Sequence, residues 1–202
     1  MSFSLRSIRT LVMHESLSPE LRSYLLPLDF FYESKDIPKP CIEPVSPESL
    51  PDNERKLLVH DRDMTSTLVK HHSSDLYIEV LERVSNDNYL LRMVVLKTKD
   101  HNFPVEFGAI GMNLDQFGPE IRNEIEQGIK PLGGLLEEYS VSYNSGPRAF
   151  FKISSDSLIS TLLEVPEGTN LYGRCNELTD PEGFTLADIV EILPVERNKM
   201  DN

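Results

Sequence analysis

An arginine lies in the middle of an otherwise apolar segment, YLLRMVVL, which runs from Tyr89 to Leu96. The segment has the residue types of a β-strand, in which alternate residues share a face. Leu90, Arg92 and Val94 therefore lie on one face, and the intervening residues form a second face that is equally apolar. A guanidinium that leaves water without meeting an anion is very costly. The pattern predicts that Arg92 points into an enclosed space and pairs with an anionic group there.

A glutamate interrupts a second apolar segment, ADIVEILP, in the same way. Ile189, Glu191 and Leu193 share one face of this predicted strand. Two interpretations follow. Arg92 and Glu191 either form a structural ion pair across the sheet, or both line a cavity and bind opposite ends of a ligand. Structural ion pairs and functional sites produce the same pattern, so the strand sequences leave both interpretations open.

The segments that must position these two residues are strands in series. Turn signals such as SNDN and TDPEG separate some of them, which favours antiparallel pairing. Helical segments alternate with the strands and are expected to cover the sheet. The sequence therefore predicts an α+β fold with a mainly antiparallel sheet of about six strands, at residues 75–84, 89–99, 103–114, 147–155, 171–178 and 184–194.

Helix signals are clearest around HDRDM, where Asp63 can cap a helix that begins at Met64. A helix is also expected before this break. Further helices are expected at residues 118–128, 130–139 and 156–165, the first of them with a proline near its start and Gly128 at its end.

The first 50 residues differ from the rest of the chain. Ser18 and Pro19 can begin a short helix, as N-cap and first helical residue. Five prolines then crowd the segment IPKPCIEPVSPESLP, which is typical of an extended linker or a wrapping arm rather than a core element. We therefore expect an N-terminal arm at 1–50, a single domain at 51–197 and a tail at 198–202. The arm is expected to pack over the sheet or over a neighbour.

Composition excludes several function classes. The chain has 202 residues, 39% of them hydrophobic, and a net charge of −13. That charge argues against nucleic-acid and anionic-membrane partners, because both require a basic surface. No apolar run is long enough to cross a bilayer, and the N-terminus lacks the pattern of a signal peptide. Cys41 and Cys175 lack metal-type spacing and are expected to be reduced thiols of a cytoplasmic protein.

Five segments occur in an order that resembles the chorismate pyruvate-lyase family and its relatives that make 4-hydroxybenzoate. The resemblance covers about residues 54–195 and rests on LLVHDRDMTSTL, YLLRMVVL, KPLGGLL, LYGR and EILP. It implies conversion of chorismate to 4-hydroxybenzoate and pyruvate without a metal or an organic cofactor. It also implies an antiparallel sheet with helices on one face, and helical flaps that enclose the ligand.

The resemblance assigns roles to particular residues. Arg92 matches the arginine that binds the ring carboxylate, and Glu191 matches the glutamate at the far end of the ligand, near the ring hydroxyl. Met64 and Leu132 match positions whose backbone N–H groups contact the ligand, which suits residues at helix starts. Gly133 would let the backbone come close to a ligand. Arg92 and Glu191 are the predicted catalytic residues, with Glu191 assisting proton transfer.

The chain also departs from the family pattern. Ala109 follows Gly108 where the bacterial lyases carry an arginine, and Glu106 adds a carboxylate nearby. The second carboxylate of chorismate would then need another cation. Arg174 and Arg148 are the candidates, and Arg174 is counted among the predicted substrate-binding residues.

Three functions are compatible with these observations. The leading interpretation is a carbon–oxygen lyase that acts on chorismate in the biosynthesis of ubiquinone or another aromatic compound. The alternatives are a non-catalytic, sensor-type module on the same fold, and a lyase for a different enolpyruvyl or aromatic acid. Each has a small aromatic or cyclohexadiene carboxylate as its partner, and the protein is expected to be a monomer or a homodimer.

A metal site is not expected. His60, His71 and His72 lie near two aspartates in the sequence, but adjacent histidines diverge on a helix and no HExxH-type spacing is present. We interpret this region as a solvated helix end.

Overall fold

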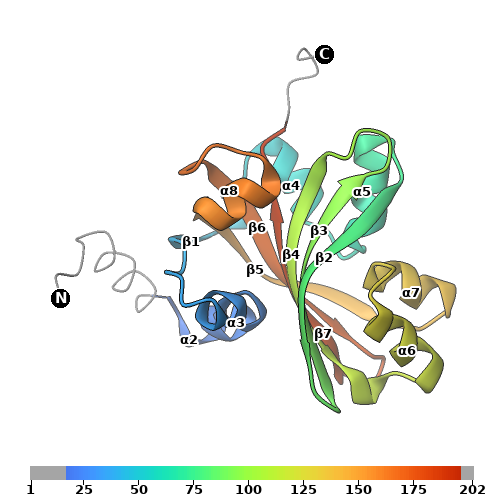
Figure 1. The fold of residues 1–202 in the computed structure, drawn as a ribbon. Coiled ribbons are helices and arrows are strands. Elements are labelled where there is room, and N and C mark those ends of the chain that lie inside the picture. The colour runs from blue at the N-terminus through green and yellow to red at the C-terminus, as the bar shows by residue number, and fades with distance from the viewer. Residues whose placement is uncertain (1–16, 197–202) are drawn as a thin grey trace.

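The fold is seen in a computed structural model that describes residues 17–196 (Figure 1). Residues 1–16 of the expected arm, which contain the segment compared with a signal peptide, and the expected tail at 198–202 lie outside the described residues. The helices and short 3₁₀ turns are α2 (Pro19–Tyr24), α3 (Leu26–Ser34), η1 (Pro47–Ser49), α4 (Asp52–Leu58), α5 (Met64–His72), η2 (Leu114–Gln116), α6 (Pro119–Gln127), α7 (Leu132–Glu138) and α8 (Ser157–Leu163).

One antiparallel sheet of seven strands forms the centre of the domain, in the order β1-β5-β6-β7-β4-β3-β2. The expected α+β class is therefore confirmed, with one strand more than the predicted six. The strands are β1 (Ile42–Val45), β2 (Leu76–Ser85), β3 (Tyr89–Thr98), β4 (Pro104–Asn113), β5 (Asn144–Ser154), β6 (Asn170–Thr179) and β7 (Thr185–Leu193).

Local signals explain where several helices begin and end. Ser18 caps α2 by accepting a hydrogen bond from the Leu21 N–H, as its sequence context predicts. Asp63 caps α5 by accepting from the Ser66 N–H at 2.8 Å, so the predicted start at Met64 is confirmed.

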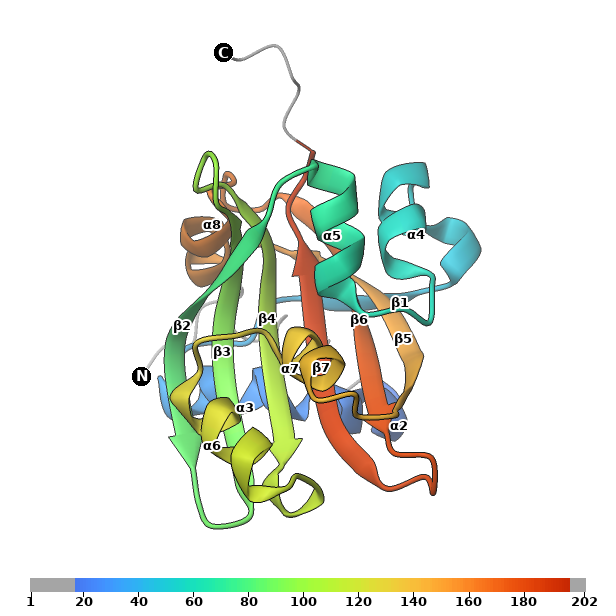
Figure 2. The ribbon, with the colours of Figure 1, turned by 90° about the vertical axis from the view of Figure 1, so that its right-hand side faces the viewer.

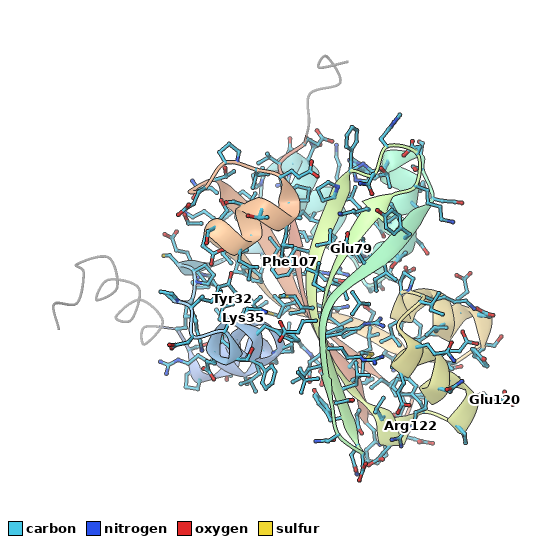
Figure 3. The ribbon with its side chains drawn as sticks, in the orientation of Figure 1. Tyr32, Lys35, Glu79, Phe107, Glu120 and Arg122 are labelled. Atoms are coloured by element: carbon cyan, nitrogen blue, oxygen red, sulfur yellow. The ribbon has the colours of Figure 1, made fainter. Side chains whose placement is uncertain are left out.

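The first face of the sheet is covered by α2, α3 and α8. Figure 3 shows Tyr32 of α3 and Phe107 of β4 on this side of the sheet, and both side chains are buried. Strand residues such as Phe151 and Val190 complete an apolar core here. Burial of these large side chains is the main source of stability on this face.

The second face is covered by α4, α5, α6 and α7, which stand in front of the sheet in Figure 2. The starts of α5 and α7 lie close together, and α6 packs against α7. This face carries Arg92, Glu106, Arg174 and Glu191, all of them buried. The arrangement agrees with the expected helices on one face and helical flaps over a cavity on the other.

The proline-rich segment is extended as predicted, but it is not a linker. Ile42–Val45 hydrogen-bonds to β5 and forms an edge strand of the sheet. Pro44 is compatible with this position because an edge strand has a side without partners. Ile42 is buried in the apolar core, as are Leu28 and Phe31 of α3. The expectation that this segment contributes no core residue is therefore wrong, because the prolines hide a short apolar strand.

No helix among the described residues is long and apolar enough to span a membrane.

Candidate functional site

A cavity of about 70 Å³ lies between the second face of the sheet and the first residues of α5 and α7. The sheet supplies its floor and the two helix starts supply its cover. Its lining residues are Asp63, Met64, Thr65, Ile78, Arg92, Val94, Leu96, Glu106, Gly108, Ile110, Pro131, Leu132, Gly133, Tyr143, Asn176, Leu178, Ile189 and Glu191.

Arg92 is the only basic side chain among these described lining residues. It is 2% exposed, and its Nε and Nη1 have no hydrogen-bond partner within residues 17–196. Burial lowers the pKa of Arg92 to about 10, and the charge of neighbouring Arg83 adds to this effect. Arg92 is therefore still a cation at neutral pH, with its charge uncompensated at the cavity wall.

Glu191 also lines the cavity, but it does not pair with Arg92. Its carboxylate accepts a hydrogen bond from Nε of Arg174, the directly opposite residue on β6. Strand β4 separates β3 from β7, so the Cα atoms of Arg92 and Glu191 lie roughly 12 Å apart at standard strand spacing. The interpretation of these two residues as a structural ion pair across the sheet is therefore wrong.

Arg174 is fully buried behind Glu191 and is not among the lining residues. Its Nη1 donates to the backbone carbonyl oxygens of Leu58 and His60, both at 3.0 Å. These contacts tie the end of α4 to the sheet and fix the position of Glu191. The structure thus places Arg174 beside the cavity rather than in it, and its predicted part in substrate binding stays a prediction.

The helix starts bring Met64 and Leu132 to the cavity, where both line its wall. The first N–H groups of a helix have no intrahelical partner and carry a partial positive charge, so they can receive an anionic or polar ligand group. Gly133 lines the cavity too, but a Cβ there would lie 3.3 Å from Oδ1 of Asp63. Its small size lets α7 approach the cap of α5, a reason different from the predicted approach to a ligand.

Glu106 is a lining residue that the sequence analysis did not place among the site residues. It is 5% exposed, and its Oε2 has no hydrogen-bond partner in the described part of the chain. Burial raises the pKa of Glu106 well above the ordinary value, and the negative charge of Glu191 raises it further. Like Arg92, Glu106 interrupts an apolar strand on the face of Ile110, and this signal was available in the sequence.

Neither Ala109 nor the candidate cation Arg148 belongs to the cavity. Ala109 faces the opposite, apolar core and lines no part of the cavity. Arg148 forms an ion pair with Glu177 near the surface, so it does not supply a second cation to the cavity.

The histidines are also separated: His60 contacts the carbonyl oxygen of Leu57, and His71 lies 3.1 Å from Glu196. Among residues 17–196, no group of three or more metal-ligating side chains is present.

The structure is an α+β fold with a seven-strand antiparallel sheet, and it matches the chorismate lyase-like fold. The effector domain of PhnF from Mycobacterium smegmatis matches with a TM-score of 0.53 at 11% identity, covering 69% of this chain and 93% of that domain. PhnF from the same organism matches with a TM-score of 0.52 at 11% identity, covering 69% of this chain and 66% of PhnF.

At this identity the likeness shows the fold alone. The sequence matches no protein-family model and no curated protein. The resemblance to chorismate pyruvate-lyases is therefore supported at the level of the fold, and the activity that it implies is not.

Proposed function

We propose that this protein binds a small organic monocarboxylate in the cavity beneath α5 and α7 and serves as a sensor-type module. The observation that carries the proposal is Arg92, a buried cation at the cavity wall whose Nε and Nη1 have no partner among the described residues. A buried charge of this kind is costly to keep, and a ligand carboxylate would compensate it with charge-assisted hydrogen bonds.

Apolar lining residues indicate that the body of the ligand is a hydrocarbon ring. Val94, Ile110, Leu178 and Ile189 supply the walls between the polar ends of the cavity. The cavity is smaller than the about 150 Å³ that holds one benzene ring in a protein core. A one-ring carboxylate therefore fits only when α5 and α7 move outward, and a larger ligand is disfavoured.

The charges of the site favour one carboxylate per ligand. Arg174 already compensates Glu191, and Asp63 and Glu106 add acidic groups to the lining. A ligand with two carboxylates, such as chorismate, would bring its second charge towards these acids. The matching domain of PhnF is described as an effector domain, which agrees with a sensor-type module.

Calorimetric titration with 4-hydroxybenzoate tests this function. Wild-type protein should bind it, and Arg92→Met should weaken binding by at least about 100-fold through loss of a charge-assisted hydrogen-bond pair. Arg148→Met is the matched control, because it removes an arginine of the same sheet that is already paired at the surface. Equal affinity in wild type and Arg92→Met would reject the proposed site.

A second candidate function is a lyase that converts chorismate to 4-hydroxybenzoate and pyruvate. It is favoured by two carboxyl groups, Glu106 and Glu191, that share the cavity with Arg92 and can exchange protons with a bound ring. Incubation of the protein with chorismate, followed by chromatography, tests it. Equimolar 4-hydroxybenzoate and pyruvate from wild type, absent with Arg92→Met, would establish the lyase and displace the sensor assignment.

A further inference from the structure

Glu106 is a buried carboxyl group with one oxygen atom that has no hydrogen-bond partner among the described residues. It projects from β4 on the cavity side of the sheet, and its Oε2 has no hydrogen-bond partner within residues 17–196. Its Oε1 lies 3.2 Å from the point that a Cβ of Gly108 would occupy. Cγ2 of Val94 lies 3.3 Å from the same point, so a side chain at position 108 would crowd both the carboxyl group and Val94.

The groups around Glu106 favour the protonated form of its carboxyl group. Glu191 and Asp63 line the same cavity and disfavour a negative charge on Glu106, and Arg174, whose charge opposes this effect, is engaged by Glu191. Burial raises the pKa of Glu106 well above its ordinary value, and the charge of Glu191 raises it further. Both effects favour the protonated form of Glu106, which offers one O–H donor and a carbonyl acceptor.

Arg92 and Glu106 lie on strands β3 and β4, on the same face and four positions apart in register, since Arg92 is opposite Ile110 and Leu96 is opposite Glu106. A ligand held at Arg92 by its carboxylate thus extends over Val94 and Gly108 towards Glu106. The far end of the ligand then meets a neutral acid in a region where the protein's other charges are negative or already paired.

We propose that Glu106 determines the specificity of this cavity by hydrogen-bonding an uncharged polar group, such as a hydroxyl, at the end of the ligand opposite its carboxylate. This inference rests on the proposed carboxylate binding at Arg92. It assigns the two ends of the ligand to two different side chains, a cation for the carboxylate and a neutral acid for the hydroxyl.

Titration with benzoate and 4-hydroxybenzoate tests the inference, because the two probes differ only in the para hydroxyl. Wild type should bind 4-hydroxybenzoate about tenfold or more tightly than benzoate, since a site built to hydrogen-bond a hydroxyl discriminates against the analogue that lacks it. Glu106→Leu should bring the ratio of the two affinities close to one. Glu106→Gln should preserve most of the ratio, because the amide keeps a donor and an acceptor.

Benzoate binding by the variants separates the possible outcomes. If Glu106→Leu still binds benzoate in an Arg92-dependent manner, the cavity is folded and the lost hydroxyl preference belongs to Glu106. An unchanged ratio in Glu106→Leu overturns the inference and leaves the proposed function intact. Loss of the ratio in Glu106→Gln as complete as in Glu106→Leu also overturns it. If wild type binds neither probe, the proposed function fails and the inference fails with it.

A third probe tests whether the preferred group is uncharged. Terephthalate carries a second carboxylate at the para position and should bind more weakly than benzoate. Binding of terephthalate as tight as or tighter than that of benzoate would show that the region around Glu106 accepts a negative charge, which contradicts the inference.

Discussion

The two faces of the sheet bury different kinds of side chain. The face under α2, α3 and α8 is closed by fully buried aromatic and aliphatic side chains, among them Phe31, Phe107 and Phe151. The face under α5 and α7 buries ionisable side chains beside a cavity, and three of them, Arg92, Glu106 and Arg174, have polar atoms without a hydrogen-bond partner within residues 17–196. Because strand residues alternate between faces, each strand contributes to both environments.

Under the proposed function, this difference separates the residues that stabilise the domain from those that bind its ligand. The closed face gains free energy from apolar burial and tight packing. The cavity face buries polar atoms that have no hydrogen-bond partner among the described residues. Under the proposed function, a ligand supplies those partners. Substitutions on the closed face should therefore cost stability, whereas those at Arg92 and Glu106 should cost function and spare stability.

The largest effect is expected on the closed face. Phe31→Ala removes a side chain that is 0% exposed and leaves a cavity in the core, so it should destabilise the protein by about 3–5 kcal/mol. Urea denaturation measures this loss. Phe184→Ala, at a position that is 60% exposed, is the matched control and should change stability by no more than about 0.5 kcal/mol. Similar losses for both variants would remove the distinction between core and surface.

Arg174→Met should give the next largest effect, although it lies on the cavity face. It leaves the buried carboxylate of Glu191 without its partner, and breaking a buried ion pair costs about 3 kcal/mol or more. Thermal unfolding measures the change. The double variant Arg174→Met with Glu191→Leu should recover most of the stability, because it removes both charges. No recovery would show that Arg174 acts chiefly through its contacts with α4.

Arg92→Met should change the stability of the protein in the opposite direction. Since no group within the described residues pairs with this guanidinium, its replacement by an apolar side chain should leave stability unchanged or raise it by up to about 2 kcal/mol. The same thermal measurement compares it with Arg148→Met, which loses only a surface pair. Destabilisation of Arg92→Met by more than about 1 kcal/mol would reveal a compensating partner and weaken the contrast between the faces.

The smallest effect depends on pH. Burial, with a further contribution from the charge of Glu191, holds the pKa of Glu106 above its ordinary value of 4.5. The folded state therefore binds the Glu106 proton more tightly than the unfolded state does. The contribution of this proton to the free energy of unfolding is lost as pH rises above 4.5 towards the pKa of the folded state. Glu106→Gln should match wild type near about pH 4 and become more stable than wild type as pH rises, by at most about 1.4 kcal/mol per unit. A difference in melting temperature between wild type and Glu106→Gln that stays constant across the pH series would contradict this expectation.

The sequence predicted most of the strands and helices because their signals are local. The alternation in YLLRMVVL and the cap at Asp63 each depend on a few neighbouring residues, and both predictions are confirmed. The edge strand at Ile42–Val45 was missed because prolines mask it and its partner, β5, lies about a hundred residues away.

Pairings within the site were harder to predict because they depend on strand register. Glu191 and Arg92 were recognised as anomalies, but the order β6-β7-β4-β3 puts Arg174 beside Glu191 and leaves Arg92 two strands away. A sequence pattern identifies which face a residue occupies but not which strands are neighbours. The role of Glu106 depends on the same information, because only the register places it over Gly108 and beside Glu191.

The most direct test of the account is a crystal structure of the protein with 4-hydroxybenzoate. The account predicts the ligand carboxylate within hydrogen-bonding distance of Nε and Nη1 of Arg92, the hydroxyl against Glu106, and α5 and α7 displaced outward. A ligand that binds outside this cavity, for example in the groove that Phe30 and Leu91 line beside α3, would contradict the central claim.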